Sequence, residues 1–199
     1  MQNSYVMEMG PYGPLTPGFC SHPRDSYRCG ANVPLYRMLI DMPGKARAAR
    51  VPLYRIDRGR DHLYTTDRQE AKTTPTYERV EAYVSDTPQV YRNGQQCLFK
   101  PLLRLYSTKY DDHFYTLDED EAEKAKNTYK REKEAGFCSD PADFRRCGAT
   151  RPLYRAYYYG GTMKDRDHWY TTDYYEYRNK TKNDPKTTGE GITCYVWPA

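Results

Sequence analysis

The sequence predicts a mainly β fold with short helices, arranged as a single pseudo-threefold repeat domain that is trefoil-like or a closed β ring. The first observation is that three segments align with one another, with starts at Pro52, Pro101 and Pro152, roughly 50 residues apart. The second is that each segment carries the same succession of strand, turn and helix-start signals. Three units of this size favour a closed domain, because an open solenoid needs capping repeats.

The first two elements of each segment are predicted to form a β-hairpin. The head Pro-Leu-Tyr-Arg, or Pro-Leu-Leu-Arg in the middle copy, alternates apolar and polar positions and begins with proline, which a strand tolerates at its first residue. After a turn of variable length, His-aromatic-Tyr-Thr alternates again. The expected strand pairs are 52–55 with 62–65, 101–104 with 113–116, and 152–155 with 168–171.

A short helix and a third strand complete each segment. The helix starts at an Asp-x-x-Glu pattern, in which the aspartate would accept from an amide of the first turn and the glutamate would reach back, as in a capping box. In the middle helix, acidic residues at 119–121 precede Lys124 and Lys126, as the helix dipole prefers. The helix-start pairs are Asp67 with Glu70, Asp118 with Glu121, and Asp173 with Glu176.

The repeats also predict the domain organisation. We expect an N-terminal arm with a partial repeat tail at residues 1–33 and a single repeat domain at residues 34–199. The domain comprises units at about 51–100, 101–151 and 152–199, which we name the first, second and third segments. The arm and the start of the domain overlap residues 18–37, which copy the tail of the second segment and the head that follows it.

Tyrosine supplies much of the apolar surface of this chain. Only 38% of the residues are hydrophobic, yet 15% are aromatic and 22 are tyrosine. No apolar run approaches the length of a membrane span, so we expect no transmembrane helix. The net charge of +4 is mild and mixed along the chain, which does not favour a nucleic-acid partner.

The cysteines leave two interpretations open. Residues 1–17 lack a basic region followed by an apolar core, so no secretory signal peptide is predicted, and with Met1 as the native start the expected location is the cytoplasm. Two cysteine pairs with the same spacing would form either small disulfide loops, which imply an extracellular location, or duplicated buried thiols. Their spacing is too long for a zinc knuckle. The pairs are Cys20 with Cys29 and Cys138 with Cys147.

Three histidines occupy the same position in the three segments. His62, His113 and His168 each follow an aspartate directly. If symmetry brought the imidazoles together, they would form a metal site, which is the weaker of two alternatives. The other is that each histidine bonds a backbone carbonyl or the preceding aspartate and fixes its own hairpin turn.

Arginine and tyrosine recur in the same way, and again two roles are open. An arginine at the end of each head would form a bidentate pair with the aspartate of the second strand or of the helix cap. Alternatively, the arginines and tyrosines would line three equivalent pockets that bind a sugar, since aromatic faces stack on sugar rings. The candidate binding residues are Arg55, Arg104, Arg155, Tyr64, Tyr115 and Tyr170.

The motif set of residues 30–199 resembles an uncharacterised family of tandem repeats found in bacterial surface proteins and in animal proteins. The resemblance is carried by the Pro-Leu-Tyr-Arg heads, the Asp-His-aromatic-Tyr-Thr element and a tail that ends in Tyr-Val. It implies a non-catalytic binding or adhesion module, sometimes supposed to be lectin-like, and it carries no site residues over to this chain. The cysteine-bearing tails and Leu103 in place of the head tyrosine depart from the pattern.

The function expected from the sequence is structural. We find no nucleophile elbow, zinc-protease or phosphate-loop motif and expect neither an enzyme nor a cofactor. Tyrosine runs at 157–159 and at Tyr174, Tyr175 and Tyr177 exceed what one small core absorbs, and tyrosine and arginine are enriched at interfaces. We therefore expect docking into an assembly with an acidic surface, such as a cytoskeletal filament, for example tubulin in a cilium. The alternative is a secreted or surface-associated lectin-like module.

Overall fold

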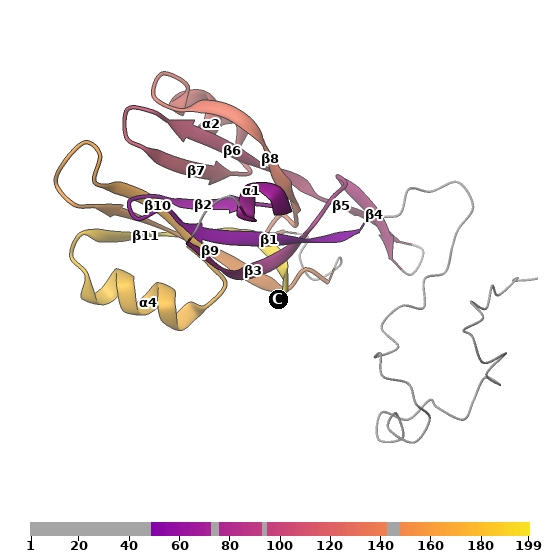
Figure 1. Ribbon diagram of the computed structural model, residues 1–199. Helices are drawn as coiled ribbons and strands as arrows, with labels where there is room; N and C mark the ends of the chain where they lie inside the picture. The colour runs from indigo at the N-terminus through magenta and orange to yellow at the C-terminus, as the bar shows by residue number, and fades with distance from the viewer. Residues whose placement is uncertain (1–48, 73–75, 93–94, 143–147) are drawn as a thin grey trace, which may run out of the picture. The chain divides into compact units, whose positions relative to one another are not determined.

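The computed structural model describes residues 49–72, 76–92, 95–142 and 148–199, all of which belong to one unit, Ala46–Ala199 (Figure 1). The fold is mainly β with short helices, as predicted. The expected arm, the copied stretch and the expected start of the domain at residue 34 lie outside the described residues. Among the residues described, no helix is long and apolar enough to cross a membrane.

Each of the three segments contains two strands, a helix and a third strand, in that order. β2 has the predicted bounds, and the other hairpin strands extend beyond the predicted cores by one to four residues, because the cross-strand pairing continues past these cores. The elements are β1 (Arg50–Asp57), β2 (His62–Thr65), α1 (Arg68–Lys72) and β3 (Tyr77–Ser85); β6 (Lys100–Ser107), β7 (Asp112–Thr116), α2 (Glu119–Ala125) and β8 (Lys130–Cys138); and β9 (Arg151–Tyr159), β10 (Arg166–Thr171), α4 (Tyr174–Asn183) and β11 (Thr187–Pro198).

The head strand is the middle strand of each segment. β1 pairs antiparallel with β2 and β3, β6 with β7 and β8, and β9 with β10 and β11. Shorter contacts join the third strands into an open antiparallel sheet, since β3 pairs with the end of β11 and with β8. An isolated bridge between Ser139 and Tyr195 links the chain after β8 to β11.

A β-bulge recurs in the third strand of each segment. In β3 the register shifts so that one extra residue, Glu78, stands opposite β1 between the partners of Arg55 and Ile56. The same shift leaves Glu132 as the extra residue in β8 and Glu190 in β11. Because a bulge redirects a side chain, it turns each of these glutamates toward the arginine of the head strand.

At the helix starts, the aspartates form the predicted caps but the glutamates do not. Asp118 accepts from the amides of Asp120 and Glu121 at the start of α2, and Asp67 and Asp173 do the same for α1 and α4. The glutamates do not reach back to the cap. The cap amide instead donates to a threonine hydroxyl, Thr116 in the second segment, which in turn donates to Glu121. Half of the expected capping box is therefore wrong.

The central core is built from equivalent positions of the three segments. It contains Leu53, Leu102 and Leu153 of the head strands, surrounded by the tyrosines of the second strands. A second cluster around Trp197 and Phe99 lies beside the hairpin β4 (Gln89–Arg92) and β5 (Gln95–Leu98). This hairpin was not predicted, although the Asn-Gly dipeptide between its strands is a strong hairpin signal.

Candidate functional site

The repeated tyrosines form a closed cycle of hydrogen bonds in the core. The hydroxyl of Tyr115 accepts from the amide of Tyr64 at 2.7 Å and donates to its carbonyl at 2.8 Å. Tyr170 makes the same two bonds to the backbone of Tyr115, and Tyr64 makes them to the backbone of Tyr170. The three rings meet edge to face, with centroids 5.3–5.6 Å apart.

This cycle provides hydrogen-bond partners for backbone groups on the inner edges of three strands. Among the strands that the structure describes, β2, β7 and β10 have no neighbour on that side, so their buried amides and carbonyls need other partners. The tyrosine hydroxyls provide them. All three side chains are 1% exposed, and burial raises the pKa of Tyr64 and Tyr115 well above the usual value. The prediction that Tyr64, Tyr115 and Tyr170 line a sugar pocket is therefore wrong, because no face is open to a ligand.

The repeated histidines bind aspartates of other segments. Asp61 accepts from the backbone amide of His113 at 2.7 Å and lies 2.7 Å from Nδ1 of the same residue. His168 is held in this way by Asp112, and His62 by Asp167. The aspartate and the histidine that are adjacent in the sequence thus bind residues of two different segments. The expected bond to the preceding aspartate is not formed.

The imidazoles do not converge, but the aspartates do. Carboxylate oxygens of Asp61, Asp112 and Asp167 lie within 4.8 Å of one another. Each carboxylate already binds an imidazole and a backbone amide, so the buried carboxylate oxygens have hydrogen-bond partners. The structure therefore does not assemble the metal site considered for His62 and its two equivalents, and gives the Asp-His pairs a structural role.

The pH dependence of stability should carry a contribution from His113. Burial by itself lowers the pKa of His113, but the hydrogen bond to Asp61 and the nearby carboxylate of Glu132 more than offset it and raise the pKa above its usual value of about 6.5. A raised folded-state pKa gives stability that is fully present below pH 6.5 and is lost as the pH rises through the folded-state pKa. We therefore expect the free energy of unfolding to fall as the pH rises from 6.5 through the folded-state pKa of His113.

The measurement is urea denaturation at a series of pH values from about 6 to 9. The variant His113→Gln is the comparison, because it removes the titrating group while keeping a side-chain amide near Asp61. Its curve should be flatter than that of the wild type over the interval. Parallel curves for the two proteins would assign the pH dependence to other groups.

The repeated arginines are clamped between two glutamates. Arg104 binds Glu70 of the first segment through both terminal nitrogens, at 2.9 and 3.1 Å, and binds the bulge residue Glu132 through Nε at 2.8 Å. Burial alone would raise the pKa of Glu70, but Arg104, Thr65 and Lys133 bring it down to about 2. Arg155 binds Glu121 and Glu190 in the same way, and Arg55 binds Glu78 through Nε and both carboxylate oxygens of Glu176 through a single terminal nitrogen.

These clamps decide between the two roles predicted for the arginines. The bidentate pair is present, but its partner is the helix-start glutamate of a neighbouring segment and not an aspartate. Arg55 and Arg104 are buried and Arg155 is nearly so, which removes them from any surface pocket. Arg55, Arg104 and Arg155 join segments to one another, so their predicted role in ligand binding is wrong.

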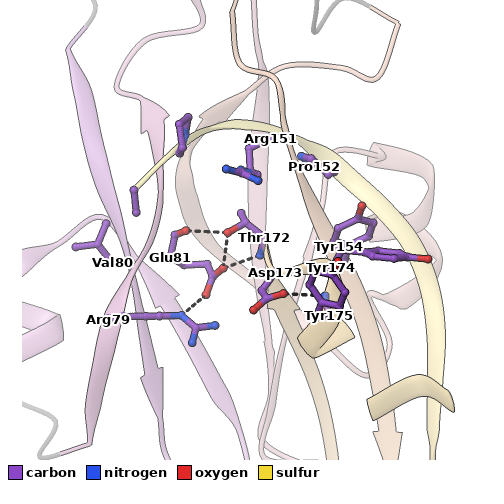
Figure 2. A pocket seen from close by; sticks show the side chains of 12 residues that line it. Arg79, Val80, Glu81, Arg151, Pro152, Tyr154, Thr172, Asp173, Tyr174 and Tyr175 are labelled. Atoms are coloured by element: carbon purple, nitrogen blue, oxygen red, sulfur yellow. Dashed lines mark hydrogen bonds and ion pairs between the residues drawn. The ribbon is translucent and has the colours of Figure 1, made fainter. Parts of the chain in front are cut away.

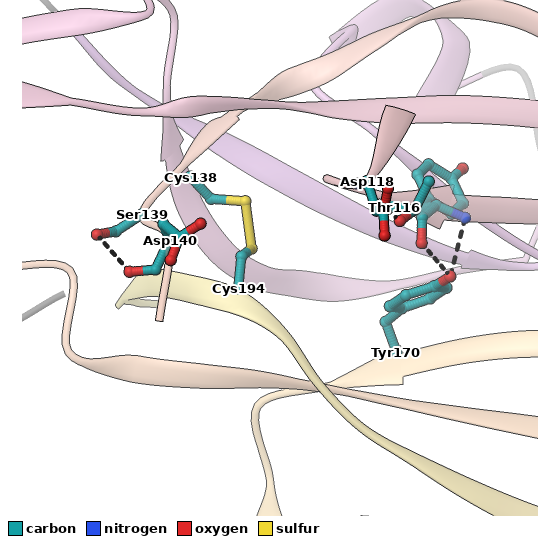
Figure 3. The surroundings of a disulfide bond; sticks show 8 residues. Thr116, Asp118, Cys138, Ser139, Asp140, Tyr170 and Cys194 are labelled. Atoms are coloured by element: carbon teal, nitrogen blue, oxygen red, sulfur yellow. Dashed lines mark hydrogen bonds between the residues drawn. A yellow bond between two sulfur atoms is a disulfide. The ribbon is translucent and has the colours of Figure 1, made fainter. Parts of the chain in front are cut away.

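Cys138 forms a disulfide with a different cysteine from the one considered in the sequence analysis. Cys138 of β8 is bonded to Cys194 of β11, and both are fully buried (Figure 3). The expected pair of Cys138 with Cys147 is therefore wrong, while Cys20, Cys29 and Cys147 lie outside the described residues. Cys97 is buried and unbonded.

An open groove of about 610 Å³ lies where β3, β9 and the start of α4 meet (Figure 2). Its floor is polar. Glu81 accepts from the amide of Thr172 at 2.6 Å, from its hydroxyl at 2.9 Å, and from Arg79 at 2.9 Å. We name this feature the α4 groove; its lining is Arg79, Val80, Glu81, Arg151, Pro152, Tyr154, Thr172, Asp173, Tyr174, Tyr175, Pro198 and Ala199.

Aromatic rings form one wall of the α4 groove. Tyr154 stacks on Tyr177 with centroids 4.8 Å apart and contacts Tyr174 at 5.7 Å, and Tyr174 meets Tyr175 at 6.2 Å. Tyr174 is 48% and Tyr175 79% exposed. The run at 174–177 was predicted to exceed what the core absorbs, and these exposures agree with that prediction. Arg79 and Arg151 had no signal in the sequence, because only tertiary pairing brings them to this position.

The comparisons with known proteins identify a family for this chain. No curated protein and no solved structure matches the chain. One family profile, described as a domain of unknown function (DUF5648), matches residues 57–197, which includes the tyrosine cycle, the Asp-His pairs and the clamps of Arg104 and Arg155, while Arg55 precedes the match. Since this match covers most of the sequence, the chain belongs to the family of the domain of unknown function DUF5648.

Proposed function

We propose that this chain is a non-enzymatic structural protein that docks into a larger assembly through its tyrosine- and arginine-rich surface, together with its N-terminal residues. The observation that carries the proposal is the division of labour among the polar side chains. The repeated histidines, aspartates, arginines and buried tyrosines are committed to contacts between segments. Tyr174, Tyr175 and Arg151 of the α4 groove, by contrast, are exposed and open to a partner.

The same contacts support a pseudo-threefold arrangement of the three segments. We infer that they are related by rotation, as in a trefoil-like or ring-shaped domain. Three independent sets of bonds, those of tyrosine, of histidine and of arginine, each run from one segment to another and return to the first after three steps. A rotation by a third of a turn is the simplest operation that produces all three.

Charge favours an acidic partner. Tyr174, Arg178 and Lys182 are spaced by four residues along α4, so they share one face of the helix, and all three are exposed. Arg151 lines the α4 groove together with Tyr174. A filament with acidic surface segments fits this face, and tubulin in a cytoplasmic or ciliary microtubule is our specific example.

The test is co-sedimentation of the full chain with microtubules assembled from purified tubulin. We expect the chain to pellet with intact microtubules and to pellet less with microtubules whose acidic tails have been removed by subtilisin. The effect should weaken as salt rises, because exposed charges are screened. If the chain stays in the supernatant with both preparations at low salt, tubulin is not the partner.

A lectin-like function is the second candidate, favoured by the buried bond between Cys138 and Cys194. Disulfides persist mainly in oxidising compartments, where glycan ligands are abundant. In this case the exposed ring of Tyr175 would be the stacking platform. A glycan array probed with the wild type and with Tyr175→Ala separates the candidates, since only a lectin would bind a defined glycan and lose it in the variant.

A further inference from the structure

Comparison of the three segments reveals where the chain departs from its own repeat. The residue that follows the cap aspartate is Arg68 in α1, Glu119 in α2 and Tyr174 in α4. The next residue is Gln69, Asp120 or Tyr175, respectively. The clamps and cycles are kept in all three segments, so the fold does not require aromatic residues at these positions. Of these three helix starts, only that of α4 carries two adjacent exposed tyrosines.

Helix α4 also sits on the sheet differently from α1 and α2. The fourth residue after the cap is buried Ala71 in α1 and buried Ala122 in α2, but it is Tyr177 in α4, a helix in which no residue is buried. Gly189 in β11 makes room for this ring, since a Cβ at that position would clash with the hydroxyl of Tyr177. The result is a longer helix that carries an aromatic row from Tyr177 to the groove.

The polar groups of the groove favour a carboxylate over a sugar. The carboxylate of Glu81 is occupied by Thr172 and Arg79, and that of Asp173 caps the helix, so few acceptors remain for sugar hydroxyls. Within the described residues, the guanidinium of Arg151 has no hydrogen bond or ion pair, and it is exposed. An exposed arginine beside aromatic rings suits a carboxylate next to an apolar side chain.

We propose that the α4 groove binds one extended acidic peptide segment per chain, with an apolar side chain against Tyr154 and Tyr174. A carboxylate of the segment pairs with Arg151, and further carboxylates face Arg178 and Lys182 along α4. The volume of about 610 Å³ lies within the range of about 300–1,000 Å³ common for ligand sites. This inference rests on the proposed docking function and names the site and the class of ligand.

The experiment measures binding of a fluorescent peptide, Glu-Glu-Glu-Phe-Glu-Glu-Glu, to the full chain by anisotropy, with calorimetry for stoichiometry. We expect one peptide per chain, and no binding of the same peptide with glutamine in place of glutamate. Arg151→Glu should weaken binding about tenfold or more, because it removes an attraction and adds a repulsion. Tyr174→Ser should weaken binding about fivefold, through loss of an aromatic contact.

The first segment offers a matched control for the charge reversal. Arg68→Glu changes the net charge by the same amount at the first position of α1, and it should leave the affinity within about twofold. Thermal unfolding of every variant checks that the fold is kept. The inference is overturned if the wild type does not bind the acidic peptide, if three peptides bind per chain, or if Arg68→Glu weakens binding as much as Arg151→Glu.

Failure of this inference can be told apart from failure of the docking function. If Arg151→Glu and Tyr174→Ser still co-sediment with microtubules like the wild type, the docking function stands and the α4 groove is not the site. If the wild type binds neither microtubules nor the peptide, both are rejected together. Loss of microtubule binding in the groove variants, but not in Arg68→Glu, supports both.

Discussion

Replacing Tyr115 by phenylalanine is expected to lower the free energy of unfolding by about 3 kcal/mol. The lost hydroxyl bonds both the amide and the carbonyl of Tyr64. Without it, two buried backbone groups have no partner, and each such group costs about 1–3 kcal/mol. The ring stays in place against Tyr64 and Tyr170, so the variant isolates the hydrogen bonds from the packing. Urea denaturation followed by fluorescence of the buried Trp169 and Trp197 provides the measurement.

The matched control for this substitution is Tyr175→Phe. It removes a hydroxyl from a side chain that is 79% exposed, and its effect should stay within about 0.5 kcal/mol. Equal losses in the two variants would mean that water replaces the bonds of the tyrosine cycle at no cost. Tyr64→Phe and Tyr170→Phe should each cost about as much as Tyr115→Phe, which also tests the proposed pseudo-threefold arrangement.

The sequence was sufficient to predict the elements inside each segment. Alternation at the heads and at His-aromatic-Tyr-Thr identified the hairpins, and Asp118 and its equivalents identified the helix starts, because these signals depend on neighbours in the chain. The hairpin of β4 and β5 was missed although its Asn-Gly signal was present, since it falls outside the repeat.

Contacts between segments were not predictable from the same patterns. The hairpin role predicted for the histidines paired each of them with the preceding aspartate, Asp112 for His113, whereas the observed partner is Asp61 in another segment. Because each residue type occurs in three copies, each side chain has three candidate partners, and the sequence pattern does not indicate which copy is adjacent in space. Arg79 and Arg151 were missed for a related reason, because only the pairing of β11 with both β3 and β9 brings them to one groove.

The second large effect is expected from the disulfide between Cys138 and Cys194. The bond closes a loop with a sequence separation of 56, for which loop entropy in the unfolded chain gives a stabilisation of about 4 kcal/mol. Apart from this bond, the bridge between Ser139 and Tyr195 is the backbone pairing that joins this end of the second segment to β11. Dithiothreitol should therefore lower the urea midpoint of the wild type substantially.

The double variant Cys138→Ala/Cys194→Ala separates this effect from general effects of the reductant. It should start at the reduced midpoint and should not respond to dithiothreitol, while Cys97→Ala, which lacks a bonded partner, should respond as the wild type does. An equal response in the double variant would contradict a stabilising role for the bond. Alkylation of the protein from its native source then decides between the two candidate functions. Free thiols at 138 and 194 would mean that the chain folds stably without this bond and does not need an oxidising compartment. That outcome favours docking in a reducing compartment.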